Sequence, residues 1–125
     1  MKKLKILLVD GQEITRELLE EFLSYDHKVS LAEDGVKTQE ALIKEKGGYD
    51  LVITDHRMPR LLGVELVRWI KTRYPSVKVI FLSADGQEVT SVARAAGADQ
   101  ILGNLFDYDL LIKAIKECFP VKATI

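Results

Sequence analysis

The sequence predicts an α/β fold in which a mostly parallel sheet of five strands carries helices on both faces. Short β-rich runs alternate with segments of helical period, and this alternation is repeated five times along the chain. Three of the runs are continuously apolar, as interior parallel strands are, and they cover residues 6–9, 51–53 and 79–82. Chain breakers follow the second, third and fourth helical segments, at Gly47-Gly48, Pro75 and Gly97.

Each strand is expected where β-branched and large apolar residues cluster. The runs that meet this criterion are residues 4–9, 28–32, 50–54, 77–83 and 100–103. The run 28–32 alternates between apolar and polar residues and the run 100–103 is short, so both suit the edges of the sheet. With these two at the edges, the strand order is 2-1-3-4-5 and it reverses between the first and third strands.

The helical segments are recognised by apolar residues that recur three or four positions apart. In the first segment one face carries Ile14, Leu18, Leu19, Phe22 and Leu23. In the fifth segment one face carries Leu111, Ala114, Ile115 and Cys118. Three further helices are expected between them, over residues 36–46, 63–74 and 87–96. These elements fit one domain that spans residues 1–125.

Composition and charge exclude several classes of protein. The net charge is −1 and the pI is near 6.1, which indicates no basic surface for nucleic acid or for an anionic membrane. The apolar runs are too short to cross a bilayer and no signal-peptide pattern is visible, so we expect a cytoplasmic protein. The single cysteine, Cys118, excludes an internal disulfide, and its place on an apolar helix face predicts a buried thiol.

Polar side chains stand at the ends of the predicted strands. Asp10 follows the first strand, Asp55 the third, Ser83 the fourth and Asn104 the fifth. Ligands of open α/β sheets bind beyond the carboxyl ends of the strands where the strand order reverses, so Asp10 and Asp55 should face each other there. Either acid alone is common as a turn former, but two acids beside a hydroxyl indicate a binding site. Close carboxylates repel unless a cation lies between them, and hard oxygens suit Mg²⁺.

The ordered motifs resemble the receiver domains of bacterial response regulators. They are Asp10 after Ile-Leu-Leu-Val, the segment Asp50-Leu-Val-Ile-Thr-Asp55-His-Arg-Met-Pro59, Ser83-Ala84, and Ala96-Gly97-Ala98-Asp99. Residues 31–35 and 106–107 match as well, so the resemblance covers nearly the whole chain. It implies the flavodoxin-like version of the predicted fold and a signalling module of two-component systems rather than an enzyme.

The resemblance also implies a role for each site residue. Asp55 would accept a phosphoryl group from a sensor histidine kinase, a phosphotransfer protein or a small phosphodonor. Asp10, Asp55 and the backbone carbonyl of Arg57 would hold Mg²⁺, and the Ser83 hydroxyl would bond a phosphoryl oxygen. Output would pass to a partner, or to a second copy of the chain, through the face formed by the fourth helix, the fifth strand and the fifth helix.

The sequence departs from the family pattern at four places. Gly11 stands where a second acid normally follows the first, and Asn104-Leu105 replaces a lysine followed by proline. Leu61-Leu62-Gly63 replaces the usual Met-Asp-Gly, and Ile101 takes the place of the aromatic switch residue. One acid and one lysine are lost together, so the net charge of the site is the same as in the family pattern.

These departures predict weakened chemistry, because phosphoryl transfer depends on cations that neutralise oxygens in the transition state. Without an acid at Gly11, Mg²⁺ keeps two carboxylates and one carbonyl, so weaker binding of the metal is expected. Asn104 offers a neutral amide to the phosphoryl group in place of a charge-assisted hydrogen bond, which contributes about 1.5–3 kcal/mol.

Two functions fit these residues. One is a receiver phosphorylated on Asp55 with weak Mg²⁺ assistance; the other is a pseudo-receiver, a protein-interaction module that signals without phosphorylation. Two enzyme classes fit poorly. A flavodoxin would need a hydroxyl- and glycine-rich phosphate loop where the acidic segment 10–13 stands, and a haloacid-dehalogenase-type phosphatase would need a second aspartate where Gln12 stands.

Overall fold

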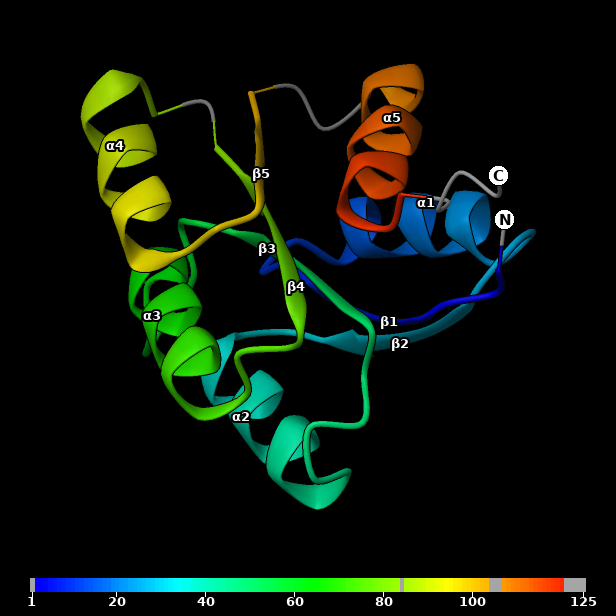
Figure 1. The fold of residues 1–125 in the computed structure, drawn as a ribbon, viewed down its shortest axis with the longest axis horizontal. Coiled ribbons are helices and arrows are strands. Elements are labelled where there is room, and N and C mark those ends of the chain that lie inside the picture. The colour runs from blue at the N-terminus through cyan, green and yellow to red at the C-terminus, as the bar shows by residue number, and fades with distance from the viewer. Residues whose placement is uncertain (1, 84, 104–106, 121–125) are drawn as a thin grey trace, which may run out of the picture.

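The computed structural model describes residues 2–83, 85–103 and 107–120. Strands and helices alternate along the chain, as Figure 1 shows. The strands are β1 (Lys5–Val9), β2 (Lys28–Ala32), β3 (Leu51–Asp55), β4 (Lys78–Leu82) and β5 (Gln100–Leu102). The helices are α1 (Glu13–Leu23), α2 (Gly35–Lys44), α3 (Gly63–Arg73), α4 (Gln87–Ala96) and α5 (Tyr108–Cys118).

All neighbouring strands pair in parallel, and their order in the sheet is β2-β1-β3-β4-β5. This confirms the predicted fold class, the order of the strands and both edges. In the register, Val9 of β1 lies opposite Thr54 of β3. The residues that follow these two, Asp10 and Asp55, are therefore brought to the same edge of the sheet at adjacent positions.

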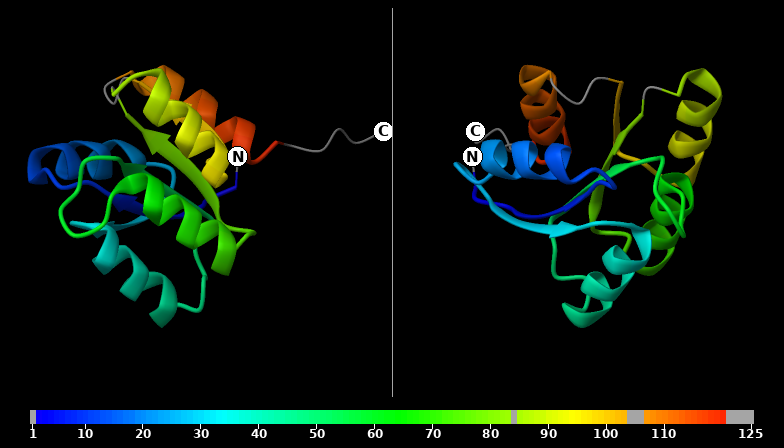
Figure 2. Two further views of the ribbon diagram at one scale, coloured as in Figure 1. Left: turned by 90° about the vertical axis from the view of Figure 1, so that its left-hand side faces the viewer. Right: turned by 180° about the vertical axis from the view of Figure 1, so that it is seen from behind.

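The helices form two layers around the sheet, with α2, α3 and α4 on one face and α1 and α5 on the other (Figure 1 and Figure 2). Successive strand residues point to opposite faces. In β3, Val52 joins the core under α2–α4, whereas Leu51 and Ile53 join the core under α1 and α5. Each of these side chains is fully buried, which stabilises the fold by about 1.5–3 kcal/mol per residue.

The predicted bounds of β2 and α4 match the observed ones, and those of the other elements with predicted bounds differ by one or two residues. The largest difference is at α2, which ends at Lys44 instead of residue 46. Lys46 and Gly47 adopt φ values of 54° and 72°, and the N–H of Gly47 donates to the carbonyl of Leu42 at 2.7 Å. This left-handed turn closes the last turn of the helix, and it explains the glycine at position 47.

The buried face of α1 differs from the prediction in its first turns. Leu19 and Leu23 are buried as expected, but Ile14 is 73% exposed and Leu18 is 41% exposed. Thr15 occupies the buried position instead. The line that faces the sheet runs through residues 15, 19 and 23, four apart, and leaves the other two apolar side chains at its margin.

Cys118 lies in the core beneath α5 and is 7% exposed, which confirms the prediction of a buried thiol. Burial raises the pKa of this thiol to about 11. Because the thiolate is the reactive form, alkylation by iodoacetamide at pH 8 should be at least about 100-fold slower than that of free cysteine. The same reaction in urea is the control, and equal rates in the folded and unfolded protein would contradict the prediction.

Within the described residues, no helix combines the length and the apolar character that a membrane span requires.

Candidate functional site

The structure brings Asp10 and Asp55 together at the carboxyl ends of the two central strands. Asp10 directly follows β1 and is 1% exposed, whereas Asp55 is the last residue of β3 and is half-buried. The charge of Asp55 contributes to the raised pKa of Asp10. The two carboxylates therefore repel each other, as the register of their strands predicts.

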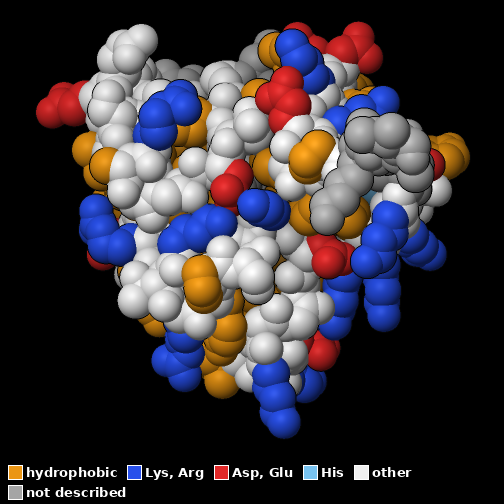
Figure 3. Space-filling model, in the orientation of Figure 1, with side chains coloured by type: hydrophobic (Ala, Val, Ile, Leu, Met, Phe, Trp, Pro, Cys, Tyr) orange, Lys and Arg blue, Asp and Glu red, His pale blue; other side chains and the backbone are white. Residues whose placement is uncertain are grey.

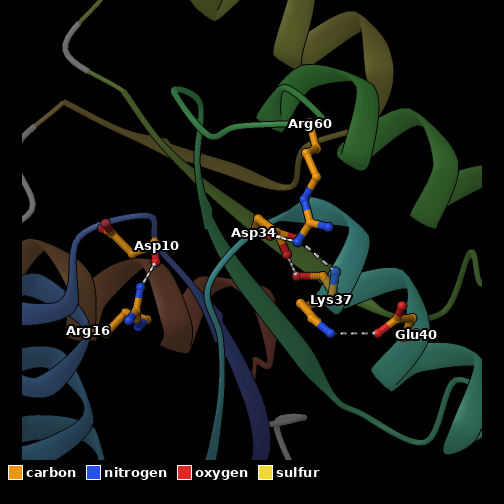
Figure 4. A network of polar contacts seen from close by, with 7 residues as sticks. Asp10, Arg16, Asp34, Lys37, Glu40 and Arg60 are labelled. Atoms are coloured by element: carbon orange, nitrogen blue, oxygen red, sulfur yellow. Dashed lines mark hydrogen bonds and ion pairs between the residues drawn. The ribbon is translucent and has the colours of Figure 1, made fainter.

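The carboxylate of Asp10 is only half satisfied. Its Oδ1 accepts a hydrogen bond of 2.8 Å from the N–H of Gln12, while Oδ2 is buried with no partner among the described residues. Arg16 offsets this charge only in part, because its guanidinium donates to the main-chain oxygen of Asp10 at 2.5 Å and not to the carboxylate (Figure 4). Burial, together with the charge of Asp55, raises the pKa of Asp10 above its ordinary value.

Asp55 is held by the main chain that follows it. The N–H of His56 donates to Oδ1 at 2.7 Å. Burial raises the pKa of Asp55, and so does the charge of Asp85, while the N–H groups of His56 and Arg57 oppose the shift. The ring of His56 lies against Phe81, 5.6 Å between centroids, under the α2–α4 layer, so it points away from Asp55 as the alternation of strand residues predicts.

The oxygen atoms at this edge of the sheet are suitable ligands for Mg²⁺. Asp10 offers an unpartnered oxygen, Asp55 offers a second carboxylate, and hard oxygens of this kind are the ligands that Mg²⁺ prefers. A Cβ placed on Gly11 would lie 3.8 Å from the carbonyl oxygen of Arg57, so this carbonyl also lies beside the loop that follows β1. No group of three or more His, Cys, Asp or Glu side chains in the described part of the chain is arranged to hold a metal. The side-chain ligands would thus be two carboxylates.

Ser83 follows β4 and bonds to Asp85, a residue that the strand-end reasoning did not single out. The Ser83 hydroxyl donates to Oδ2 of Asp85 at 3.2 Å and accepts from its N–H at 3.0 Å. Oδ1 of Asp85 accepts a hydrogen bond of 2.8 Å from Nε of Arg57 and lies 2.6 Å from a terminal guanidinium nitrogen. The signal that could have found Asp85 is its position: it is an acid on the loop after an interior strand.

Arg60, three residues beyond Arg57, is bound elsewhere. Its guanidinium forms an ion pair with the buried carboxylate of Asp34, as Figure 4 shows. Asp34 is also the N-cap of α2, where its carboxylate accepts from the N–H of Lys37 at 2.9 Å. The two arginines of the β3–α3 loop therefore have different acidic partners, and only Arg57 reaches toward β4.

Gly63 is a second residue of the site whose role the sequence pattern alone does not reveal. It opens α3, and its N–H donates to the carbonyl of His56 at 2.9 Å. A Cβ at this position would clash with the main-chain oxygen of Asp55 and would lie 2.7 Å from Cα of His56. Glycine is thus required because the helix start packs directly against the chain at Asp55.

We expect Gly63→Ala to destabilise the protein by about 1–3 kcal/mol, since backbone must move to admit the methyl group. Urea unfolding measures this change, and Gly103→Ala is the matched control because a Cβ at Gly103 would meet, among the described residues, only the carbonyl oxygen of Ser83, at an ordinary contact distance of 3.7 Å. Neither Gly63 nor Gly103 has a positive φ, so the control reports an added methyl group without a clash and without backbone strain. Equal stability of Gly63→Ala and wild type would contradict the close packing.

Asn104, expected in place of the family lysine, lies outside the described residues. Ile101 lies on β5 and is partly buried against the α2–α4 core, at the position of the aromatic switch residue.

Comparison with known proteins gives concordant matches. A family model described as the response regulator receiver domain matches residues 6–116. The transcriptional regulatory protein DegU of Brevibacillus brevis is 32% identical over 117 residues, which cover 91% of this chain and 49% of DegU. Sporulation initiation phosphotransferase F of Bacillus subtilis is 29% identical over 121 residues, which cover 95% of this chain and 96% of that protein. This chain thus spans about half the length of DegU and nearly all of phosphotransferase F.

Solved structures agree with the sequence matches. The response regulator TrrA of Thermotoga maritima, solved in complex with Mg²⁺-BeF, superimposes with a TM-score of 0.83 at 32% identity, over 95% of this chain and 100% of TrrA. The signal receiver domain of an HD domain-containing protein of Pseudomonas fluorescens gives a TM-score of 0.85 at 27% identity, over 94% and 88% of the two chains. The ordered motifs, the strand order and the matched length lead to one conclusion: the chain belongs to the response regulator receiver domain family.

Proposed function

We propose that this receiver domain of two-component signalling accepts a phosphoryl group on the carboxylate of Asp55. The observation that supports this best is the position of Asp55 at the end of a central strand, beside an Asp10 oxygen that is buried without a partner. A bound cation would stabilise the negative charge of this buried oxygen. Asp10, Asp55 and the carbonyl of Arg57 would hold Mg²⁺, which when bound neutralises oxygens of the transferred group.

In the proposed step, Asp55 is the nucleophile. The hydrogen bond from the N–H of His56 fixes Oδ1 and leaves Oδ2 to attack phosphorus. An O–P bond forms while the P–N bond of a phosphohistidine, or the P–O bond of an acyl phosphate, breaks, and the leaving group keeps the bonding electrons. Ser83 would then donate its hydroxyl hydrogen to a phosphoryl oxygen, and Asn104 would stand in place of the family lysine.

We infer that residues 1–125 form one receiver domain and that it is located in the cytoplasm, where the kinase domains of sensor histidine kinases bind ATP. The phosphodonor would be a sensor histidine kinase or a phosphotransfer protein. Output would use the α4–β5–α5 face, toward a partner or a second copy of the chain. Val92 of α4 and Leu110 of α5 are exposed apolar side chains on these helices. Figure 3 shows this side of the molecule, where small hydrophobic areas are interspersed with acidic and basic side chains.

A pseudo-receiver is the second candidate. The observation that favours it is the small number of charged groups at the site: Gly11 supplies no acid, and Asn104 supplies no cation. This candidate predicts no Mg²⁺ binding by titration and an unchanged affinity for the output partner in Asp55→Ala.

The experiment that separates the two candidates is intact-mass spectrometry after incubation with Mg²⁺ and acetyl phosphate or phosphoramidate. We expect slow gain of one phosphoryl group by the wild type and none by Asp55→Asn, which keeps the shape of the side chain and removes the nucleophile. No adduct with any donor would contradict phosphorylation and favour the pseudo-receiver.

A further inference from the structure

The carboxylate of Asp85 binds both Arg57 and Ser83, the two side chains that could contact a phosphoryl group on Asp55. Oδ1 of Asp85 binds the guanidinium of Arg57 at 2.6 and 2.8 Å. Oδ2 of the same carboxylate accepts from the hydroxyl of Ser83 at 3.2 Å. The hydroxyl also accepts the N–H of Asp85 at 3.0 Å, so its hydrogen is directed to the carboxylate.

This arrangement lies beside Asp55. In the register of the sheet, Asp55 of β3 lies opposite Leu82 of β4, the residue directly before Ser83, and the charge of Asp85 contributes to the raised pKa of Asp55. Arg57 comes from the loop after β3 and Asp85 from the loop after β4, so their ion pair connects the two loops that border the acceptor.

The ion pair is suited to exchange partners. The side chain of Arg57 is 80% exposed and that of Asp85 is 20% exposed, and ion pairs so open to water hold their partners weakly. A phosphoryl group carries nearly two negative charges and three acceptor oxygens, so it competes well for a guanidinium held by a single carboxylate. Arg60 is not equivalent, because its partner Asp34 is buried.

We propose that Asp85 is a positioning residue that restrains phosphoryl transfer by holding Arg57 and Ser83, and that both are released to the phosphoryl group when Asp55 reacts. Arg57 then supplies the cationic contact that Asn104 does not. This inference rests on the proposed function, since it concerns the same reaction. It adds an autoinhibitory contact and names the cation that takes the place of the family lysine.

The test is the rate of phosphorylation by acetyl phosphate in Mg²⁺, followed by intact mass, in Asp85→Asn and wild type. The substitution keeps the shape of the side chain, removes the charge that holds Arg57 and leaves one acceptor oxygen where there were two, so we expect a rate about two- to fivefold higher. Glu88→Gln is the matched control, because it removes the same charge from an exposed residue at the start of α4, and it should react at the wild-type rate.

A second comparison shows whether the gain depends on the two released groups. Arg57→Ala should react more slowly than wild type, Arg57→Lys should recover part of the rate, and Arg60→Ala should not slow the reaction. In the double variant Arg57→Ala, Ser83→Ala, adding Asp85→Asn should give no gain. Urea unfolding of each variant confirms that a fold is present before rates are compared.

The outcomes separate this inference from the proposed function. If the wild type is phosphorylated and Asp85→Asn is no faster, the restraint by Asp85 is wrong and phosphorylation of Asp55 stands. If the gain from Asp85→Asn persists without Arg57 and Ser83, the positioning role is wrong, because the effect is then one of charge alone. If neither protein gains a phosphoryl group, both the proposed function and the inference are wrong. A phosphoryl adduct that forms only in Asp85→Asn would support the restraint.

Discussion

Replacing Gly11 with aspartate should raise the affinity for Mg²⁺ by at least about tenfold, because loss of a group that merely orients a metal ligand already costs 10–100-fold. The side chain has room: a Cβ on Gly11 would lie 3.8 Å from the carbonyl oxygen of Arg57 and 3.9 Å from Cδ of Pro59, which is ordinary contact. The new carboxylate would therefore enter beside the carbonyl proposed as a ligand, and the phosphorylation rate should rise with the affinity.

Isothermal titration with Mg²⁺ measures this change, and Gly11→Asn is the matched control because it has the same shape without the charge. In the absence of Mg²⁺, Gly11→Asp should lower the free energy of unfolding, since a third acid joins Asp10 and Asp55. Equal Mg²⁺ affinities of the aspartate and asparagine variants would show that the metal does not bind at this edge of the sheet.

Asp10→Asn is expected to stabilise the Mg²⁺-free protein at pH 7 by about 1–3 kcal/mol, the cost typical of a buried polar group that lacks a partner. The wild-type carboxylate has a buried, unpartnered Oδ2 and the charge of Asp55 beside it. The amide removes the charge, and its oxygen can still accept the hydrogen bond from Gln12.

The stability difference between Asp10→Asn and the wild type should increase as the pH rises. Burial raises the pKa of Asp10 in the folded protein above the ordinary value of 3.8. Below pH 3.8 the carboxyl is protonated in the folded and unfolded states, so it costs no stability there. As the pH rises from 3.8 through the raised pKa, Asp10 loses its proton more readily in the unfolded state than in the folded state, where burial and the charge of Asp55 disfavour the ionised form. The wild type therefore loses stability relative to Asp10→Asn.

Urea unfolding of both proteins between pH 4 and pH 8 tests this prediction. The stability difference should grow across the lower part of the range, become constant above the raised pKa, and shrink when Mg²⁺ is added. Glu21→Gln, which removes one charge from the exposed face of α1, should show no comparable gain. A stability loss in Asp10→Asn that is independent of pH and Mg²⁺ would mean that the carboxylate is structurally satisfied.

The fold and the placement of the acids could be predicted because they follow from patterns local to each element. Continuous apolar runs mark the interior strands, and polar residues directly after them must meet at one edge of a parallel sheet. Asp10 and Asp55 are therefore placed by strand ends alone. The burial of Cys118 follows in the same way from the periodicity of α5.

The polar partners around Asp55 could not be predicted, since they depend on the paths of two loops. Arg57 and Arg60 lie on the same loop, yet one binds Asp85 and the other binds Asp34. Nothing in their spacing distinguishes them. The exposed position of Ile14 was missed for a different reason: apolar periodicity defines a stripe on a helix but not the exact line of contact with the sheet.

The most direct test of phosphorylation at Asp55 is to locate the phosphoryl group after reaction with acetyl phosphate and Mg²⁺. Borohydride reduces an aspartyl phosphate to homoserine, and peptide mass spectrometry then identifies the residue that was modified. We expect homoserine at position 55 in the wild type, none in Asp55→Asn, and a higher yield in Gly11→Asp. A phosphorylated wild type with the modification at another residue, or no modification under conditions that saturate Gly11→Asp with Mg²⁺, would contradict this expectation.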